Sequence, residues 1–215
     1  MHSAWAVMSA HRYARRLPVE RRINTMTKSM VRVGVGGQGT ILASKILTNG
    51  LMEAGYDVKM SEIHGMSQRG GSVSSQVRYG EKVMSPVIEK GKADIVVSFE
   101  KMEALRALDY LKEDGVLVIN NEEIPSMSVI TGEEDYPDDV LEEIEKHARA
   151  KVVDATRLAG ELGNEKAANM ILLGTIIKSM GLEHINWEEI LQANIKPQFL
   201  ELNKKALKVG MDAVA

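Results

Sequence analysis

Hydrophobic positions follow two different periods along the chain from about residue 30 onward. Short runs of β-branched or wholly apolar residues predict strands, because strands buried on both faces of a sheet read as nearly continuous hydrophobic segments. Apolar residues spaced three and four positions apart predict amphipathic helices between these runs. The expected strands are 30–35, 56–60, 72–80, 93–99, 115–121 and 151–156. The expected helices are 40–55, 100–115, 136–150, 157–181 with a break at Gly163 and Asn164, 187–194 and 197–209.

The order of these elements indicates the fold class. Strands that alternate with helices predict an α/β, Rossmann-like fold with a mostly parallel sheet and helices on both faces. The closing run of helices adds a helical C-terminal segment. Residues 72–80 place Val73 and Val77 on one side and polar residues on the other, so we expect an antiparallel insertion around 73–84. Residues 125–132 are expected to add a short edge strand.

Charge divides the chain into two unequal parts. Residues 1–30 contain six Lys or Arg and one acid, whereas the remainder contains 21 basic and 29 acidic residues. We expect a disordered, basic N-terminal extension over 1–30, followed by one domain over 31–215. The extension lacks the apolar core of a secretory signal but superficially resembles a transit peptide. We favour an upstream extension, or a true start at Met26 or Met30.

Composition excludes several kinds of site. The 215 residues include no cysteine, which rules out disulfides and the ligands that iron–sulfur clusters and most structural zinc sites use. The five histidines are scattered without metal-ligand spacing, so we expect no metal site. The acidic body argues against nonspecific nucleic-acid binding. No apolar run approaches the roughly 18 residues of a membrane helix, so we expect no membrane partner.

A glycine-rich turn joins the first expected strand to the first expected helix. Gly34, Gly36 and Gly39 have the spacing G-x-G-x-x-G, which in dinucleotide-binding folds brings the backbone close to a pyrophosphate at a helix N-terminus. Glu62 lies about where an acid would bind the ribose, but it opens a loop, and Asp57 lies at the wrong end of its strand. The alternative is that the glycines only let the helix start close to the sheet.

The segment 62–73, EIHGMSQRGGSV, is rich in groups that bind ligands and poor in groups that pack. Arg69 offers a planar fork for phosphate or carboxylate. Ser67 and Gln68 offer neutral hydrogen bonds, and His64 is a possible proton or anion contact. At the carboxyl edge of a parallel sheet, this segment would face the glycine turn across the usual crevice.

An ordinary explanation of the same segment is a solvated connection in which Arg69 pairs with Glu62. We favour binding or an interface, because binding groups gather on loops that a scaffold positions. Ser67 and His64 do not form a triad without an orienting acid, so we predict no catalytic residue in this chain.

Four stretches together resemble one family. VGVGGQGTILASKIL, SEIHGMSQRGGSVSSQVRYG, SPVIEKGKADIVVSFEKMEALR and NMILLGTIIKSMG are similar to the gamma-type subunits of the 2-oxoacid:ferredoxin oxidoreductases, and most similar to the indolepyruvate branch. The resemblance covers about residues 31 to 210, and its most specific segments are HGMSQRGG and SPVI.

The resemblance implies oxidative decarboxylation of a 2-oxoacid, with coenzyme A as acceptor of the acyl group and ferredoxin as acceptor of electrons. It implies that thiamine diphosphate and iron–sulfur clusters belong to a large alpha subunit, which this chain would support within a cytoplasmic complex. Residues of this chain then become candidates for the phosphate-rich end of coenzyme A or for the partner interface. These candidates are Gly34, Gly36, Gly37, Gln38, Gly39, Ser67, Gln68, Arg69, Gly70 and Gly71.

Two other functions stay open at this point. The glycine turn alone would suit a stand-alone NAD(P)-dependent dehydrogenase. The lack of an evident acid–base pair would suit a nucleotide-binding regulatory module without a reaction.

Overall fold

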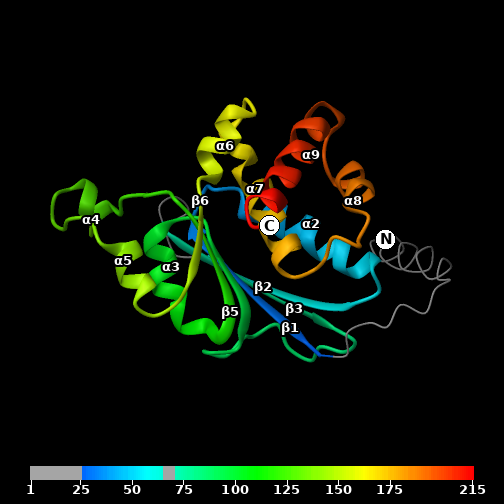
Figure 1. Ribbon diagram of the computed structural model, residues 1–215, viewed down its shortest axis with the longest axis horizontal. Helices are drawn as coiled ribbons and strands as arrows, with labels where there is room; N and C mark the ends of the chain where they lie inside the picture. Colours follow the sequence, from blue (N-terminus) through cyan, green and yellow to red (C-terminus); the bar gives the residue numbers. More distant parts are fainter. Residues whose placement is uncertain (1–25, 65–70) are drawn as a thin grey trace, which may run out of the picture.

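A computed structural model describes residues 26–64 and 71–215. Its six strands form one sheet in the order β2-β3-β1-β4-β5-β6 (Figure 1). The strands are β1 (Lys28–Val35), β2 (Asp57–His64), β3 (Ser72–Gly80), β4 (Ala93–Ser98), β5 (Leu111–Asn120) and β6 (Ala150–Val153). The α-helices are α2 (Thr40–Glu53), α3 (Lys101–Ala107), α4 (Met127–Ile130), α5 (Val140–Glu145), α6 (Ala155–Glu161), α7 (Ala168–Ser179), α8 (Trp187–Asn194) and α9 (Pro197–Asp212).

The sheet is mostly parallel, with one reversed strand. β3 pairs antiparallel with both β1 and β2, whereas β1, β4, β5 and β6 pair in parallel. The predicted fold class and the antiparallel insertion are therefore confirmed. β3 lies between β1 and β2, so the second strand of the chain forms an edge of the sheet rather than a neighbour of the first.

Helices cover the two faces of the sheet separately, and each layer has its own core. On one face α2 and α6 to α9 enclose a core that includes Met30, Leu47 and Ile171. On the other face α3 and α5 enclose a smaller core around Val31 and Val96. Side chains of β1 therefore alternate between the two cores, which explains why apolar residues occupy both faces of this strand, interrupted by Arg32.

The helix expected over 100–115 is wrong in its second half. α3 ends at Ala107, a short 3₁₀ turn follows over Leu108–Tyr110, and β5 already begins at Leu111. Lys112 Nζ lies 2.8 Å from a carboxylate oxygen of Asp94, which holds this part of the chain against the start of β4. Local helix periodicity is overridden here by pairing across the sheet.

Two further expectations concern the connections after β5. The edge strand expected over 125–132 is wrong: Ser126 caps the short helix α4 instead, and Gly132 follows with a φ of 77°. The break predicted at Gly163 and Asn164 is confirmed, because Gly163 has a φ of 97° and Asn164 caps the 3₁₀ turn that precedes α7.

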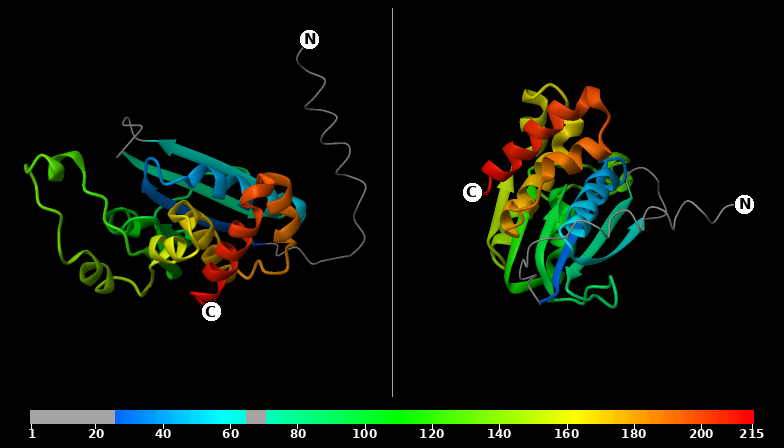
Figure 2. Two further views of the ribbon diagram at one scale, coloured as in Figure 1. Left: turned by 90° about the horizontal axis from the view of Figure 1, so that it is seen from above. Right: turned by 90° about the vertical axis from the view of Figure 1, so that its right-hand side faces the viewer.

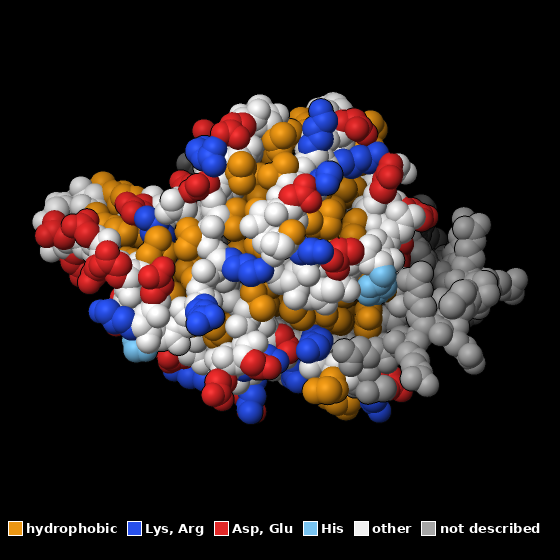
Figure 3. All heavy atoms as spheres, in the orientation of Figure 1, with side chains coloured by type: hydrophobic (Ala, Val, Ile, Leu, Met, Phe, Trp, Pro, Cys, Tyr) orange, Lys and Arg blue, Asp and Glu red, His pale blue; other side chains and the backbone are white. Residues whose placement is uncertain are grey.

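The connection that contains α4 projects from the body of the protein (Figures 1 and 2). Acidic side chains gather on this projecting part (Figure 3). In the described ranges, no helix is both long and apolar enough to cross a bilayer. The basic extension falls almost entirely outside the described residues, although β1 begins at Lys28, before the expected domain boundary.

Candidate functional site

The glycine turn, residues 34–39, is fixed from two sides. The amide of Gly36 donates a hydrogen bond to the carbonyl of Gly71 at 2.9 Å, so the turn meets the end of the 62–73 segment directly. The Gln38 side chain accepts from the amide of Val35 at 2.8 Å and donates to the carbonyl of Phe99 at 3.0 Å. The turn is thereby tied to the end of β4 and to the start of β3.

Close packing and backbone conformation explain the glycines of this turn. A Cβ on Gly34 would lie 2.7 Å from Gln38 Oε1 and 2.9 Å from Phe99 Cβ. Gly37 and Gly39 have φ values of 107° and 74°, which side chains disfavour. Gly39 is the N-cap of α2, and among the described residues no side chain caps this helix. The start of α2 therefore has the character of an anion-binding helix terminus.

A crevice of about 690 Å³ opens beside this turn. It lies outside the carboxyl ends of β1, β4 and β5, where β1 leads to α2 on one face and β4 leads to α3 on the other. Open α/β sheets usually bind ligands at such a position. Lining residues include Gly37, Gln38, Gly39, Leu42, Phe99, Asn120, Thr156, Lys166, Asn169, Ile195, Lys196, Phe199 and Asn203.

Buried amide side chains form part of the crevice floor. Asn120 is 2% exposed, and its Nδ2 donates to the carbonyl of Phe99 at 3.2 Å and to Thr156 Oγ1 at 3.1 Å. Its Oδ1 accepts from the amide of Ala155 at 2.9 Å. Asn169 donates to the carbonyl of Gly39 at 3.2 Å. Neutral hydrogen bonds therefore hold the ends of β4, β5 and β6 against the glycine turn.

Glu62 does not occupy the position of a ribose-binding acid. The reversed strand β3 separates β2 from β1, so Glu62 lies one strand further from the turn than in a dinucleotide-binding fold. Its Oε1 instead accepts hydrogen bonds from Ser44 Oγ at 3.2 Å and from Ser75 Oγ at 3.0 Å. The Glu62 carboxylate therefore binds side chains of α2 and β3.

Comparison with known proteins identifies the family. The profile of the family described as pyruvate ferredoxin/flavodoxin oxidoreductase matches residues 29–213. The chain belongs to this family. It is 37% identical over 195 residues to the indolepyruvate oxidoreductase subunit IorB of Pyrococcus horikoshii, a match that covers 86% of this chain and 95% of that protein.

Solved structures of this oxidoreductase family share the fold. The gamma subunit of a keto/oxoacid ferredoxin oxidoreductase from Geobacter sulfurreducens has a TM-score of 0.64 at 21% identity, over 87% of this chain and 98% of that one. A 2-oxoglutarate:ferredoxin oxidoreductase from Magnetococcus marinus has a TM-score of 0.68 at 19% identity. Its structure holds 2-oxoglutarate, coenzyme A and succinyl-CoA, and the match covers 87% of this chain but 31% of that longer chain.

Two buried carboxylates of this family member lie near the end of β4 but outside the crevice lining. Glu100 is 1% exposed, caps α3 by accepting from the amide of Glu103, and accepts from the Tyr136 hydroxyl at 2.5 Å. Burial, and then the hydrogen bond to Glu100, raises the pKa of Tyr136. Glu103 accepts from Ser72 Oγ at 2.5 Å and pairs with Arg106 at 2.5 Å. Both carboxylates therefore hold structure together.

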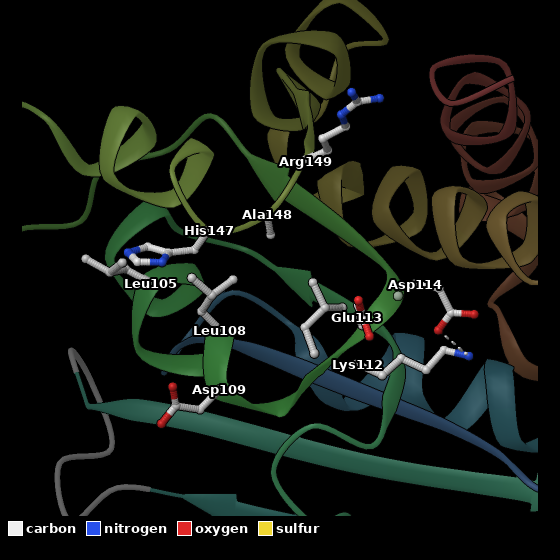
Figure 4. A pocket seen from close by; sticks show the side chains of 11 residues that line it. Leu105, Leu108, Asp109, Lys112, Glu113, Asp114, His147, Ala148 and Arg149 are labelled. Carbon is white, nitrogen blue, oxygen red and sulfur yellow. Dashed lines mark ion pairs between the residues drawn. The ribbon is translucent and has the colours of Figure 1, made fainter.

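A second hollow, of about 780 Å³, lies at the opposite ends of the strands (Figure 4). Leu105 and Leu108 line it, and the link before β6 supplies His147, which is drawn beside Leu105, and Arg149, which is drawn apart from both. Lys112 pairs there with Asp114 at 3.2 Å. The remaining lining residues are Asp109, Leu111, Glu113, Gly115 and Ala148.

The structure brings together only part of the predicted site. The glycine turn and Gly71 meet, whereas Ser67, Gln68, Arg69 and Gly70 lie outside the described residues, and His64 is placed only by its backbone, opposite Val73. In the described ranges no group of three metal-ligating side chains occurs.

No sequence motif marks the wall of the crevice that faces the turn. Lys166 lies in the 3₁₀ turn before α7, whereas Lys196 and Phe199 lie at the start of α9, all far along the chain. The one local signal was Asn120 at the end of a buried strand, a position where polar side chains of α/β folds often line sites.

Proposed function

We propose that this chain is a subunit of a 2-oxoacid:ferredoxin oxidoreductase of the indolepyruvate type. The complex would oxidatively decarboxylate arylpyruvates to acyl-CoA and transfer the electrons to ferredoxin. Membership of the family, and 37% identity over nearly the whole length of an indolepyruvate oxidoreductase subunit, support this proposal.

The chain does not fit the redox and carbanion cofactors of such a complex. Iron–sulfur clusters are held chiefly by cysteine thiolates, and the sequence has no cysteine. The described ranges also lack any cluster of acidic or histidine ligands for the metal that usually accompanies a bound diphosphate. We therefore propose that thiamine diphosphate and the clusters belong to an alpha subunit.

The part of the reaction that suits this chain is holding an anionic substrate. The observation that carries the proposal is the 2.9 Å hydrogen bond from Gly36 to Gly71, because it brings the glycine turn to the end of the segment that contains Arg69. Backbone amides at a helix start and one guanidinium suit the phosphates of coenzyme A. The crevice beside the turn offers room for a further part of the same molecule.

The dehydrogenase alternative loses its main support. It requires an acid on the strand next to β1, at the level of the glycine turn, and that strand is the reversed β3, which places Ser72 opposite Val35 and Val73 opposite Gly34 there. The regulatory-module alternative has no observation in its favour beyond the lack of an acid–base pair.

Replacing Arg69 tests the anion-binding role. In the complex assembled with the alpha subunit, we expect Arg69→Ala to raise the KM for coenzyme A by about tenfold or more, because a charge-assisted hydrogen bond contributes roughly 1.5–3 kcal/mol. The kcat at saturating coenzyme A should stay within about twofold, and the subunits should remain together in gel filtration.

Arg149→Ala is the matched control, since Arg149 is an exposed arginine in the hollow at the other end of the sheet. An unchanged KM in Arg69→Ala would refute coenzyme A binding at this segment. Loss of assembly would show that the segment belongs to the interface between subunits. Arylpyruvate-dependent turnover that persists in full without this chain would refute the subunit role itself.

A further inference from the structure

The two edges of the sheet differ in how they are protected from other chains. β6 pairs with its neighbour over only four residues, and Lys151 of this strand donates to the carbonyl of Val214 at 2.7 Å. β2, at the other edge, pairs with β3 over eight residues without a register shift. Short length and lysine are common means of keeping an edge strand from pairing with another chain. Within the described residues, no strand pairs with the outer side of β2.

The sequence of β2 lacks the usual protection of an edge strand. It contains no proline, and its one lysine, Lys59, forms an ion pair with Asp57 of the same strand. Residues 57–63 are each half-buried or exposed, whereas most residues of β3 are buried. A long and regular strand with unpaired backbone groups is a template for a further strand.

Apolar side chains are exposed on both faces of this edge. Met60 and Ile63 of β2 are 41% and 59% exposed, and they point to opposite faces, because side chains alternate along a strand. Ile41 and Met52 are also exposed, and they lie on the same side of α2 as Ser44, whose hydroxyl donates to β2. The edge therefore combines unpaired backbone groups with apolar surface, as protein interfaces do.

The connection between β3 and β4 adds apolar surface on the face of β2 that carries Ile63. Arg78, which lies opposite Lys59, donates to the carbonyls of Ser85 and Val87 at 3.2 and 3.3 Å and holds the connection against this face. Met84 and Val87 are 82% and 62% exposed there. The SPVI stretch belongs to this connection, and the proposed function gives it no role.

A second copy of β2 fits this edge. Two identical antiparallel strands in one sheet place residues of the same face opposite each other, so a twofold axis must pass through one residue. An axis at Lys59 or at Glu62 would place two like charges directly opposite each other, which is unfavourable. An axis at Ser61 would place both exposed apolar residues of the strand, Met60 and Ile63, opposite charged ones.

An axis at Met60 avoids these contacts. The two methionines then lie opposite each other, and Lys59 lies opposite Ser61. All of residues 57–63 find a partner in the other copy, whereas an axis further toward either end of the strand would leave fewer residues paired. The pattern of charged and apolar residues therefore selects one register.

We propose that the β2 edge binds a second copy of this chain, with the two β2 strands antiparallel and Met60 opposite Met60. The pairing joins the two sheets into one continuous sheet. This interface goes beyond the proposed function, because it requires neither coenzyme A nor the alpha subunit. In the assembled complex it links two copies of this chain, each with its own alpha subunit.

Single cysteines test the contact directly, because the chain has no cysteine of its own. Directly opposite Cα atoms of antiparallel strands lie about 4.5–5.5 Å apart, within the roughly 4.4–6.8 Å that a disulfide spans. Under mild oxidation of the full chain, we expect Met60→Cys to form a covalent dimer. Val152→Cys is the matched control on β6, where Val152 is 43% exposed, and it should stay monomeric on a denaturing gel.

A charge at the axis should separate the two copies. Light scattering of the wild-type full chain should give about twice the 23.7 kDa of one chain. Met60→Lys places two ammonium groups opposite each other, so the dissociation constant of the dimer should rise about tenfold or more. Met127→Lys on α4, where Met127 is 68% exposed, is the control and should leave the dissociation constant unchanged.

The proposal is overturned if the full chain has the mass of a monomer at concentrations at which the complex assembles, or if Met60→Cys and Val152→Cys cross-link equally. Cross-linking that disappears in the assembled complex would also overturn it and would assign the edge to the alpha subunit. Should Met60→Lys lose its far-UV circular dichroism, Met60→Glu replaces it with the same expected rise. Failure of the proposed function is recognised separately, because Arg69→Ala and the KM for coenzyme A do not enter this test.

Discussion

The crevice and the hollow occupy opposite ends of the same sheet and are similar in volume, about 690 and 780 Å³, but they differ in the polar groups that line them. In the crevice, the polar groups of the floor are buried and bound to the main chain, as Asn120 is to Phe99 and Ala155. In the hollow, the polar groups are charged and mostly exposed, and an ion pair joins Lys112 to Asp114 (Figure 4). Volume alone therefore does not distinguish a binding site.

The difference lies in how strongly each set of groups is held. Exposed ion pairs contribute little and rearrange easily, because water and salt screen them. Buried neutral hydrogen bonds are costly to break, so they keep their donors and acceptors in one arrangement. A site that must recognise a ligand needs buried hydrogen bonds that hold its groups in one arrangement.

Adding one methyl group at each end gives the largest expected contrast. Gly34→Ala places a Cβ against Gln38 Oε1 and Phe99 Cβ, both of which are fixed, so we expect a loss of about 1–3 kcal/mol of stability. Coenzyme A-dependent turnover at subsaturating substrate should fall by about tenfold or more, since about 1.4 kcal/mol of binding corresponds to a factor of ten. Enzyme assays and thermal unfolding measure the two effects.

Gly115→Ala is the counterpart in the hollow. Its Cβ would lie 2.6 Å from a methyl group of Leu111, a half-buried side chain that can turn away, and 3.0 Å from the carbonyl of Ala93. The expected loss is about 1 kcal/mol or less, with turnover unchanged. Equal effects of the two substitutions on turnover would remove the distinction between the two ends.

Acidification should reduce the stability that Asp94 contributes at the hollow end of the sheet. The stability contributed by the hydrogen bonds of the crevice floor should not change. Burial opposes the charge of Asp94, but hydrogen bonds from Lys112, the Ser29 amide and Lys28 together lower its pKa below the usual value. A lowered folded pKa gives stability that is present above the unfolded value of about 3.9 and is lost as pH falls through the folded pKa. The difference in melting temperature between the wild type and Asp94→Asn should therefore shrink below about pH 4.

Asn120→Ala is the corresponding variant at the crevice, and the change in melting temperature that it causes is compared at two pH values. An amide does not titrate, so its effect on the melting temperature should be the same at pH 3.5 and pH 6. A difference between Asp94→Asn and the wild type that persists undiminished below the folded pKa of Asp94 would contradict the role given to its ionised form.

The smallest expected effect concerns the outer wall of the crevice. Phe199 is 42% exposed at the start of α9, so Phe199→Ala should change stability by about 0.5 kcal/mol or less. If the crevice holds part of coenzyme A, the KM should rise about twofold to fivefold through lost apolar contact. Arg149→Ala in the hollow should leave the KM as it is, and a wild-type KM in Phe199→Ala would exclude this wall from the site.

Local patterns were enough to predict most elements of the fold. The glycine turn, α2 and the bounds of β3 follow from residues that are neighbours in sequence, so periodicity and turn chemistry identify them. The second half of the helix expected over 100–115 does not exist, because Lys112 is held at Asp94 of another strand. The position of β3 between β1 and β2 likewise depends on pairing that no local pattern encodes.

The candidate site was predictable on one side only. The turn has a recognisable spacing, and the resemblance to a known family pointed to the 62–73 segment. Thr156, Lys166 and Phe199 reach the same crevice through the packing of the last helices, and each is an ordinary residue in its own stretch of sequence. Glu62 had the spacing of a ribose acid, but its surroundings commit it to Ser44 and Ser75.

The reversed strand has one more consequence, for how this part of the protein can vary. β2 joins the sheet through β3 alone, and residues 65–71 connect these two antiparallel strands in the sequence. A hairpin tip can lengthen, shorten or change composition without shifting the strands below it, because the register is fixed by their pairing, from Asp57 with Gly80 to His64 with Val73. The same sheet can therefore accept connections of different length and chemistry between β2 and β3, while the remainder of the domain stays the same.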